Sequence, residues 1–145
     1  MGVGRKLRES GQMTVELAVA FPALIVVAVV ATNALLFFSE CAAFDNAFRD
    51  AVRIHATSPA YGQGVEQSRA RVASDLAASF DRPFEAAQVS VEGVAAGHTR
   101  FTATLEFSPT LFGLGLKSSV FGVALPSLSH TASFVVSCYK PGVIV

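Results

Sequence analysis

The chain has 145 residues and no net charge; 52% of its residues are hydrophobic and only 15% are charged. An ordinary soluble domain carries about 25% charged residues, so this composition indicates one domain plus a membrane-spanning segment. Because there is no surplus of Lys and Arg to neutralise phosphates, we expect no nucleic-acid partner.

The first predicted element is a membrane-spanning helix. Leu17 to Phe38 contains no charged residue, and as a helix it is roughly 33 Å long, which matches a hydrocarbon core of about 30 Å. This run is too long for the apolar region of a removable secretory signal, which has about 7–15 residues. Three basic residues precede it: Arg5, Lys6 and Arg8. No Lys or Arg follows until Arg49, so we expect a single-pass protein of the cytoplasmic membrane, with a cytoplasmic N-terminus and an extracytoplasmic C-terminal part.

Asn33 lies inside this apolar run. One interpretation is a polar residue that is tolerated near the far membrane interface. The other is a hydrogen bond between helices of an assembly, worth about 0.6–2 kcal/mol. Both remain open at this point.

A short motif stands directly before the apolar run. Gly11 follows the basic residues, and Glu16 comes five positions after the glycine. This arrangement resembles the class III signal of type IV prepilins, which a membrane peptidase cuts after the glycine. The resemblance implies that Gly11 ends a leader, that Gln12 is the new N-terminus and that Glu16 is the fifth mature residue.

The resemblance covers roughly the first 57 residues. GQMTVELAVAFPALIVV (residues 11–27) is similar to the start of TadE-like minor pilins of the tight-adherence (Flp-type, type IVb) pilus system, and AFDNAFRDAVRIHA (residues 43–56) is similar to a further segment of that family. Major Flp pilins carry a Glu-Tyr pair where this chain has Glu16-Leu17, which favours a minor pilin or pseudopilin. The implied partners are a prepilin peptidase, the pilus assembly platform, other pilins and membrane lipid. The implied location includes a cell-surface pilus.

Glu16 has two interpretations. After cleavage, the Gln12 amine is a positive charge one helical turn away, and a carboxylate near lipid is costly unless it is paired. Glu16 would then pair with the ammonium of a neighbouring subunit and set the axial register of an assembly. The alternative is an interfacial acid that the helix dipole favours.

Beyond the membrane, the pattern predicts that the helix continues as an amphipathic stalk to about Ser58-Pro59. Its apolar stripe has a 4-3-4-3-4 spacing: Phe37, Cys41, Phe44, Phe48, Ala51 and His55. His55 is expected as a core histidine. After a loop, a second helix is predicted over Val65 to Phe80, with one inward face: Val65, Val72, Leu76 and Phe80.

The period changes to two after Ala87 and indicates β-strands. A hairpin is predicted from Ala87 to Phe107 with a turn at Ala95–His98, and a last strand from about Ser129 to Tyr139. Between them, Thr110 to Leu128 is either a packed connector with one short strand at Ser118 to Leu125 or an exposed apolar loop that contacts another subunit. The fold class is therefore α+β: a spanning and stalk helix, a second helix and a small antiparallel sheet packed on the stalk, which is pilin-like.

Two cysteines are far apart in the sequence. Cys41 is on the stalk stripe and Cys138 is on the apolar face of the last strand, both on the expected exported side. A disulfide between them would add roughly 4–5 kcal/mol in the chain-entropy model. The alternative is two buried free thiols.

The sequence contains no recognisable catalytic constellation, so we do not expect an enzyme, a cofactor or a metal site; the three histidines lack metal-ligand spacing. Several acids are expected to be solvated: Glu66, Asp75, Asp81, Glu85 and Glu92. We divide the chain into a leader (1–11), a spanning and stalk helix (12–58) and an exported head (59–145). The resulting hypothesis is a minor pilin or pseudopilin, and the alternative is a membrane-anchored extracytoplasmic binding module that is not assembled into a fibre.

Overall fold

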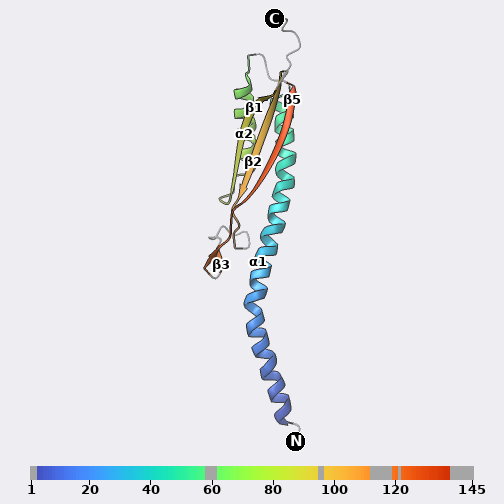
Figure 1. The fold of residues 1–145 in the computed structure, drawn as a ribbon, viewed down its shortest axis with the longest axis vertical. Helices are drawn as coiled ribbons and strands as arrows, with labels where there is room; N and C mark the ends of the chain where they lie inside the picture. The colour runs from blue at the N-terminus through green and yellow to red at the C-terminus, as the bar shows by residue number, and fades with distance from the viewer. Residues whose placement is uncertain (1–2, 58–61, 95–96, 112–118, 121, 138–145) are drawn as a thin grey trace.

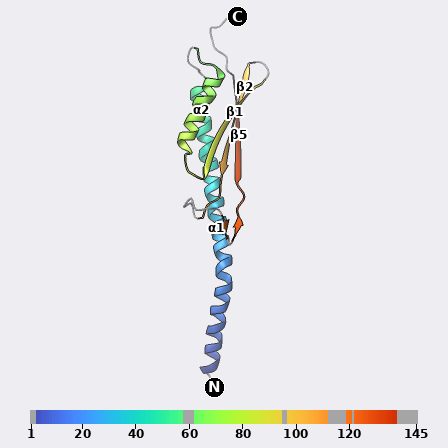
Figure 2. The same ribbon diagram turned by 90° about the vertical axis from the view of Figure 1, so that its left-hand side faces the viewer.

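The computed structural model describes residues 3–57, 62–94, 97–111, 119–120 and 122–137 (Figure 1). A long helix, α1, carries a head of one further helix and two small sheets on the half that is distant from its N-terminus (Figures 1 and 2). The elements in chain order are α1 (Val3–His55), α2 (Val65–Ser79), β1 (Glu85–Val94), β2 (His98–Phe107), β3 (Ser119–Val120), β4 (Val123–Ala124) and β5 (Leu128–Ser137). The α+β class and the long apolar N-terminal helix are confirmed.

The long helix is one element of 53 residues, with Pro22 inside it. The predicted continuation past Phe38 is confirmed, and the helix ends at His55, a few residues before the predicted Ser58-Pro59. The second helix ends at Ser79, and the backbone N–H of Phe80 caps it by donating to the carbonyl of Leu76 at 2.9 Å.

Three antiparallel strands form the main sheet in the order β1-β2-β5. The register places Phe101 of β2 between Val91 of β1 and Phe134 of β5. The central strand alternates as predicted, with Phe101, Ala103, Leu105 and Phe107 buried, and Thr99 is buried on the same face. This face packs on the helices, with α2 against β1 and α1 against β2 and β5.

The core lies between the sheet and both helices. The predicted stalk stripe supplies Phe44, Phe48 and Ala51, each at most 5% exposed, and the rings of Phe44 and Phe80 meet edge to face at 5.3 Å. Of the predicted face of α2, Val72, Leu76 and Phe80 are buried, whereas Val65, the first residue of the helix, is 36% exposed.

The segment between β2 and β5 also differs from the prediction. The interpretation as a packed connector has one short strand at Ser118 to Leu125, but the structure has two, β3 and β4, which pair as a small antiparallel hairpin. Gly122 has φ +81°, a left-handed conformation that glycine adopts without steric cost, and this permits the chain to reverse there. Residues 112–118 and 121 lie outside the described part.

Candidate functional site: the bare half of the long helix and its ties to the head

No described part of the chain packs on the N-terminal half of α1. From Met13 to Ala28 every side chain is exposed except that of Ile25, which is half-buried, and Val29 is the first fully buried residue. We call residues 13–28 the bare half; as a helix it is about 24 Å long. Among the described residues, one helical segment, Met13–His55, is long and apolar enough to cross a membrane.

Leaving the bare half in water is energetically unfavourable. Its most exposed large apolar side chains are each between 37% and 75% exposed: Met13, Val15, Leu17, Val19, Phe21, Leu24, Val26 and Val27. Full burial of one such side chain is worth about 1.5–3 kcal/mol, so covering this set stabilises the molecule by something on the order of 10 kcal/mol. Lipid tails or neighbouring helices can supply that cover.

The predicted processing and register residues lie at the start of this region. Gly11 and Gln12 are inside α1, and Glu16 is exposed on the bare half, one helical turn after Gln12. Glu16 is also the only charged residue between positions 13 and 39. A single carboxylate therefore stands on an otherwise apolar helix.

Asn33 holds the base of the head onto α1. The residue is 4% exposed. Its Nδ2 donates to the carbonyls of Val29 at 2.9 Å and Thr110 at 2.8 Å, and its Oδ1 accepts from the N–H of Thr110 at 2.8 Å. Both hydrogens of the Asn33 amide are thus used within the chain. No donor of this side chain remains for a hydrogen bond to the helix of another subunit.

A cluster of three charges joins α1 at Glu40, further toward the C-terminal end of the helix than Asn33. Arg82 Nη1 donates to Glu40 Oε1 and lies 3.3 Å from Glu85 Oε1. Glu85, expected to be solvated, is half-buried as a residue, and its side chain is only 1% exposed. Burial and the neighbouring Glu40 carboxylate raise the pKa of Glu85 above its ordinary value, while Arg82 opposes that rise. The hydrogen bond and charge of Glu40 in turn raise the pKa of Arg82.

Two histidines complete the ties between α1 and the rest of the head. His55 Nε2 lies 2.7 Å from Asp75 of α2, and His130 Nε2 of β5 lies 2.8 Å from Asp45 of α1. The prediction of His55 as a core histidine is wrong, because its side chain remains 18% exposed and engages a carboxylate that is 54% exposed. Both pairs act between elements and fix their relative positions.

Cys41 is half-buried on α1 and forms no disulfide with any residue in the described part of the chain. Its proposed partner, Cys138, lies outside the described residues, so the disulfide stays a prediction.

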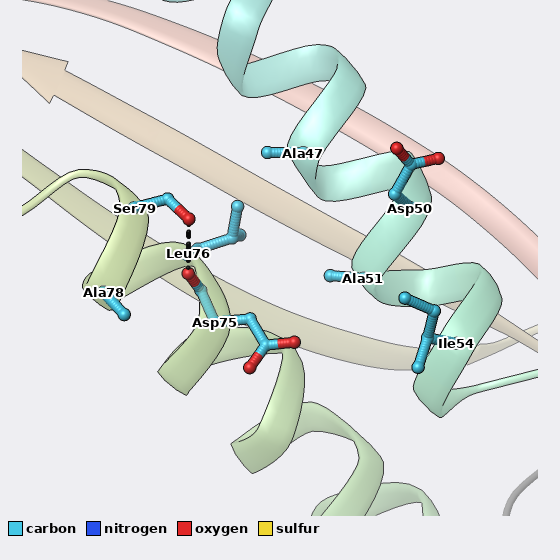
Figure 3. A pocket seen from close by; sticks show the side chains of 8 residues that line it. All are labelled: Ala47, Asp50, Ala51, Ile54, Asp75, Leu76, Ala78 and Ser79. Carbon is cyan, nitrogen blue, oxygen red and sulfur yellow. Dashed lines mark hydrogen bonds between the residues drawn. The ribbon is translucent and has the colours of Figure 1, made fainter.

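A hollow of about 390 Å³ opens between α1 and α2 (Figure 3). It exists because alanines, Ala47 and Ala51 among them, face the gap, and Asp50 and Asp75 stand beside it. Ser79 donates to the backbone carbonyl of Asp75 at 2.9 Å.

Within the described ranges, no group of three His, Cys, Asp or Glu side chains is placed to hold a metal ion.

Sequence analysis did not predict the cluster of Arg82 with Glu40 and Glu85, in which Arg82 itself is 53% exposed, although one pattern pointed to it. The alternation that turns Ala87, Val89 and Val91 inward also turns Glu85 inward when it is extended two residues back.

Comparisons with known proteins add no relative to this description. No family model matches the chain, and neither a curated protein nor a solved structure matches it.

Proposed function

We propose that this chain is a TadE-like minor pilin or pseudopilin, anchored in the cytoplasmic membrane by the bare half of α1, cleaved after Gly11 and used in the assembly of a tight-adherence pilus or related secretion fibre. The observation that carries the proposal is the bare half itself: an apolar helix without protein cover, with one carboxylate, Glu16, a turn after the proposed new N-terminus. A plain anchor has no need of a charge at that point, since a charge near lipid is costly unless it is paired.

The proposed cleavage site lies in a weak part of the helix. In an α-helix each carbonyl accepts the N–H of the residue four positions on, so a peptidase has to open the turn after Gly11 to reach its carbonyl. Glycine inside a helix costs about 1 kcal/mol relative to alanine, which lowers the free energy needed for that opening. Gly11 therefore favours cleavage for a conformational reason as well as through its small size.

The ties of the head support a role as a stiff building block. Asn33, Asp45 and His55 lie along α1 and bind three different parts of the head. Since α1 is continuous from the bare half into this region, a force or displacement applied to the bare half is passed to the head. This is the arrangement that assembly through the bare half requires.

N-terminal sequencing of the full-length protein, produced with and without an active prepilin peptidase, tests the proposal. We expect a mature chain that starts at Gln12, and retention of the leader in Gly11→Val. Gly4→Val is the matched control, since it places the same side chain on the same segment away from the cleavage site. Finding only uncleaved protein beside an active peptidase would falsify the proposal and leave the anchored binding module.

Glu16 is tested separately from cleavage. Glu16→Gln keeps the size of the side chain but removes its charge, so we expect normal processing and loss of incorporation into fibres. Normal incorporation of this variant would exclude the register role of Glu16 while leaving the cleavage proposal intact.

A further inference from the structure

The short hairpin β3–β4 lies beside the middle of α1, displaced from the main sheet toward the N-terminus of the helix (Figures 1 and 2). We call this part of the head the foot, made of the described residues 109–111, 119–120 and 122–128. A small hollow separates it from α1, lined by Val30, Asn33 and Ala34 on the helix and by Pro109, Leu125, Pro126 and Leu128 on the foot. The foot therefore rests against the second half of the charge-free run.

Helix length places this contact within the thickness of a membrane. A hydrocarbon core of about 30 Å takes about 20 helical residues, and counted from Leu17 it ends at Leu36. Asn33 is then about 5 Å and Val30 about 9 Å inside the core. The bare half alone is about 24 Å long and too short to span the same core.

Moving the helix along the membrane normal takes the contact between the foot and α1 out of the hydrocarbon core only at a cost in free energy. A shift that withdraws Asn33 from the core brings Glu16 into it, and a carboxylate there is unfavourable. Thinning of the bilayer would also cost free energy for each ångström of mismatch. If Glu16 stays outside the hydrocarbon core and the helix still spans the whole core, the foot lies at the depth of the leaflet on the side of the head.

The chemistry of the foot suits that depth. None of its described residues is charged. Val123 is 68% exposed and Leu125 is half-buried, so apolar surface faces away from the protein. Among the described residues, the charged cluster of Arg82 with its two carboxylates joins α1 at Glu40, four residues beyond Leu36.

Two parts of the foot, Thr110 and the β3–β4 hairpin, have the paired backbone that lipid requires. An unsatisfied N–H or C=O in hydrocarbon costs several kcal/mol, and irregular segments are therefore excluded from lipid unless their backbone groups are paired. Asn33 satisfies both the N–H and the C=O of Thr110, and β3 pairs with β4. A side-chain amide is suited to this task because it carries a donor and an acceptor side by side.

We propose that the foot inserts into the membrane leaflet on the side of the head, so that acyl chains cover its apolar surface and the protein enters that leaflet at a second place besides α1. The proposal rests on the membrane anchorage of the proposed function, but on neither cleavage nor assembly.

The chain contains no tryptophan, so one introduced residue reports on its own surroundings. Full-length variants with Val123→Trp in the foot, Leu24→Trp in the bare half or Thr131→Trp on the open face of β5 are reconstituted in phosphatidylcholine vesicles with and without brominated acyl chains. All three positions are exposed. We expect the emission of Val123→Trp to be blue-shifted and quenched by brominated lipid to a similar extent as that of Leu24→Trp, whereas Thr131→Trp keeps a water-like spectrum and is not quenched.

The arms separate failure of this inference from failure of the anchor. If Leu24→Trp is quenched but Val123→Trp behaves like Thr131→Trp, the foot lies in water and the inference is wrong while the anchor stands. A blue-shifted but unquenched Val123→Trp means that protein, such as a second copy, covers the foot, which also overturns it. If Leu24→Trp is not quenched, both the membrane anchorage by the bare half and the insertion of the foot are wrong.

Discussion

Substitution of Asn33 tests the contact that fixes the foot to the long helix. Its side chain makes hydrogen bonds of 2.8 Å to both the N–H and the C=O of Thr110. A typical hydrogen bond contributes about 0.5–1.5 kcal/mol net, so Asn33→Leu, which keeps much of the volume, removes about 2 kcal/mol from this contact. Since each 1.4 kcal/mol is a factor of ten, the equilibrium for local opening at Thr110 rises roughly 30-fold.

Hydrogen exchange of the Thr110 amide in the detergent-solubilised chain measures this opening. We expect its protection to fall by about that factor in Asn33→Leu, while the amide of Phe101 in the central strand keeps its protection. Asn33→Asp keeps an acceptor for the Thr110 N–H but loses the donors to the carbonyls of Val29 and Thr110, so protection should also fall. Asn46→Ala, at an exposed position of the same helix, is the control. Undiminished protection at Thr110 in both Asn33 variants would refute the assignment of this contact.

Three further substitutions probe the head, each by urea unfolding of the solubilised protein. Arg82→Met leaves two largely covered carboxylates, Glu40 and Glu85, without their cation and should lower the free energy of unfolding by about 1–3 kcal/mol. Arg69→Met removes a pair whose carboxylate, that of Glu66, is 74% exposed and should cost less than about 1 kcal/mol; equal losses would contradict a special role for the Arg82 cluster. Because burial raises the pKa of Glu85 in the folded state, the folded protein binds that proton more tightly than the unfolded chain does, so the contribution of Glu85 to stability is largest in acid and is lost as the pH rises through the raised pKa. Glu85→Gln should remove this part of the pH dependence, and an unchanged stability profile would speak against the raised pKa. Leu105→Ala empties a fully buried position and should cost about 2–5 kcal/mol, against less than about 1 kcal/mol for Val135→Ala on the open face of β5; similar losses would contradict the assigned faces.

Periodicity predicted those parts of the fold in which one face of an element is buried. The alternation of β2 identified Phe101 and Leu105 as inward, and the 4-3 spacing on the long helix identified Phe44 and Phe48. These patterns are legible in the sequence because burial on one side of a helix or strand recurs at the period of the element itself.

The polar contacts of the head were not predictable in the same way. Arg82 meets Glu40 across 42 positions of sequence, and Asn33 meets Thr110 across 77. No local period links such pairs, since they depend on how the elements pack. The hairpin β3–β4 was missed for a related reason: its strands have two residues each, too few to display an alternation.

Hydropathy does not distinguish the part of the long helix that is bare from the part that packs against the head. The charge-free run Leu17 to Phe38 looks uniform in sequence because lipid tails and a protein interior are both apolar. In the structure, the run is bare up to Ala28 and meets the head from Val29 onward. A carboxamide facing lipid alone would be costly, but at Asn33 it has a backbone N–H and C=O of the head within hydrogen-bonding distance. The polar residue in an apolar run therefore marks the level at which the head begins, and this explanation of Asn33 requires no second subunit.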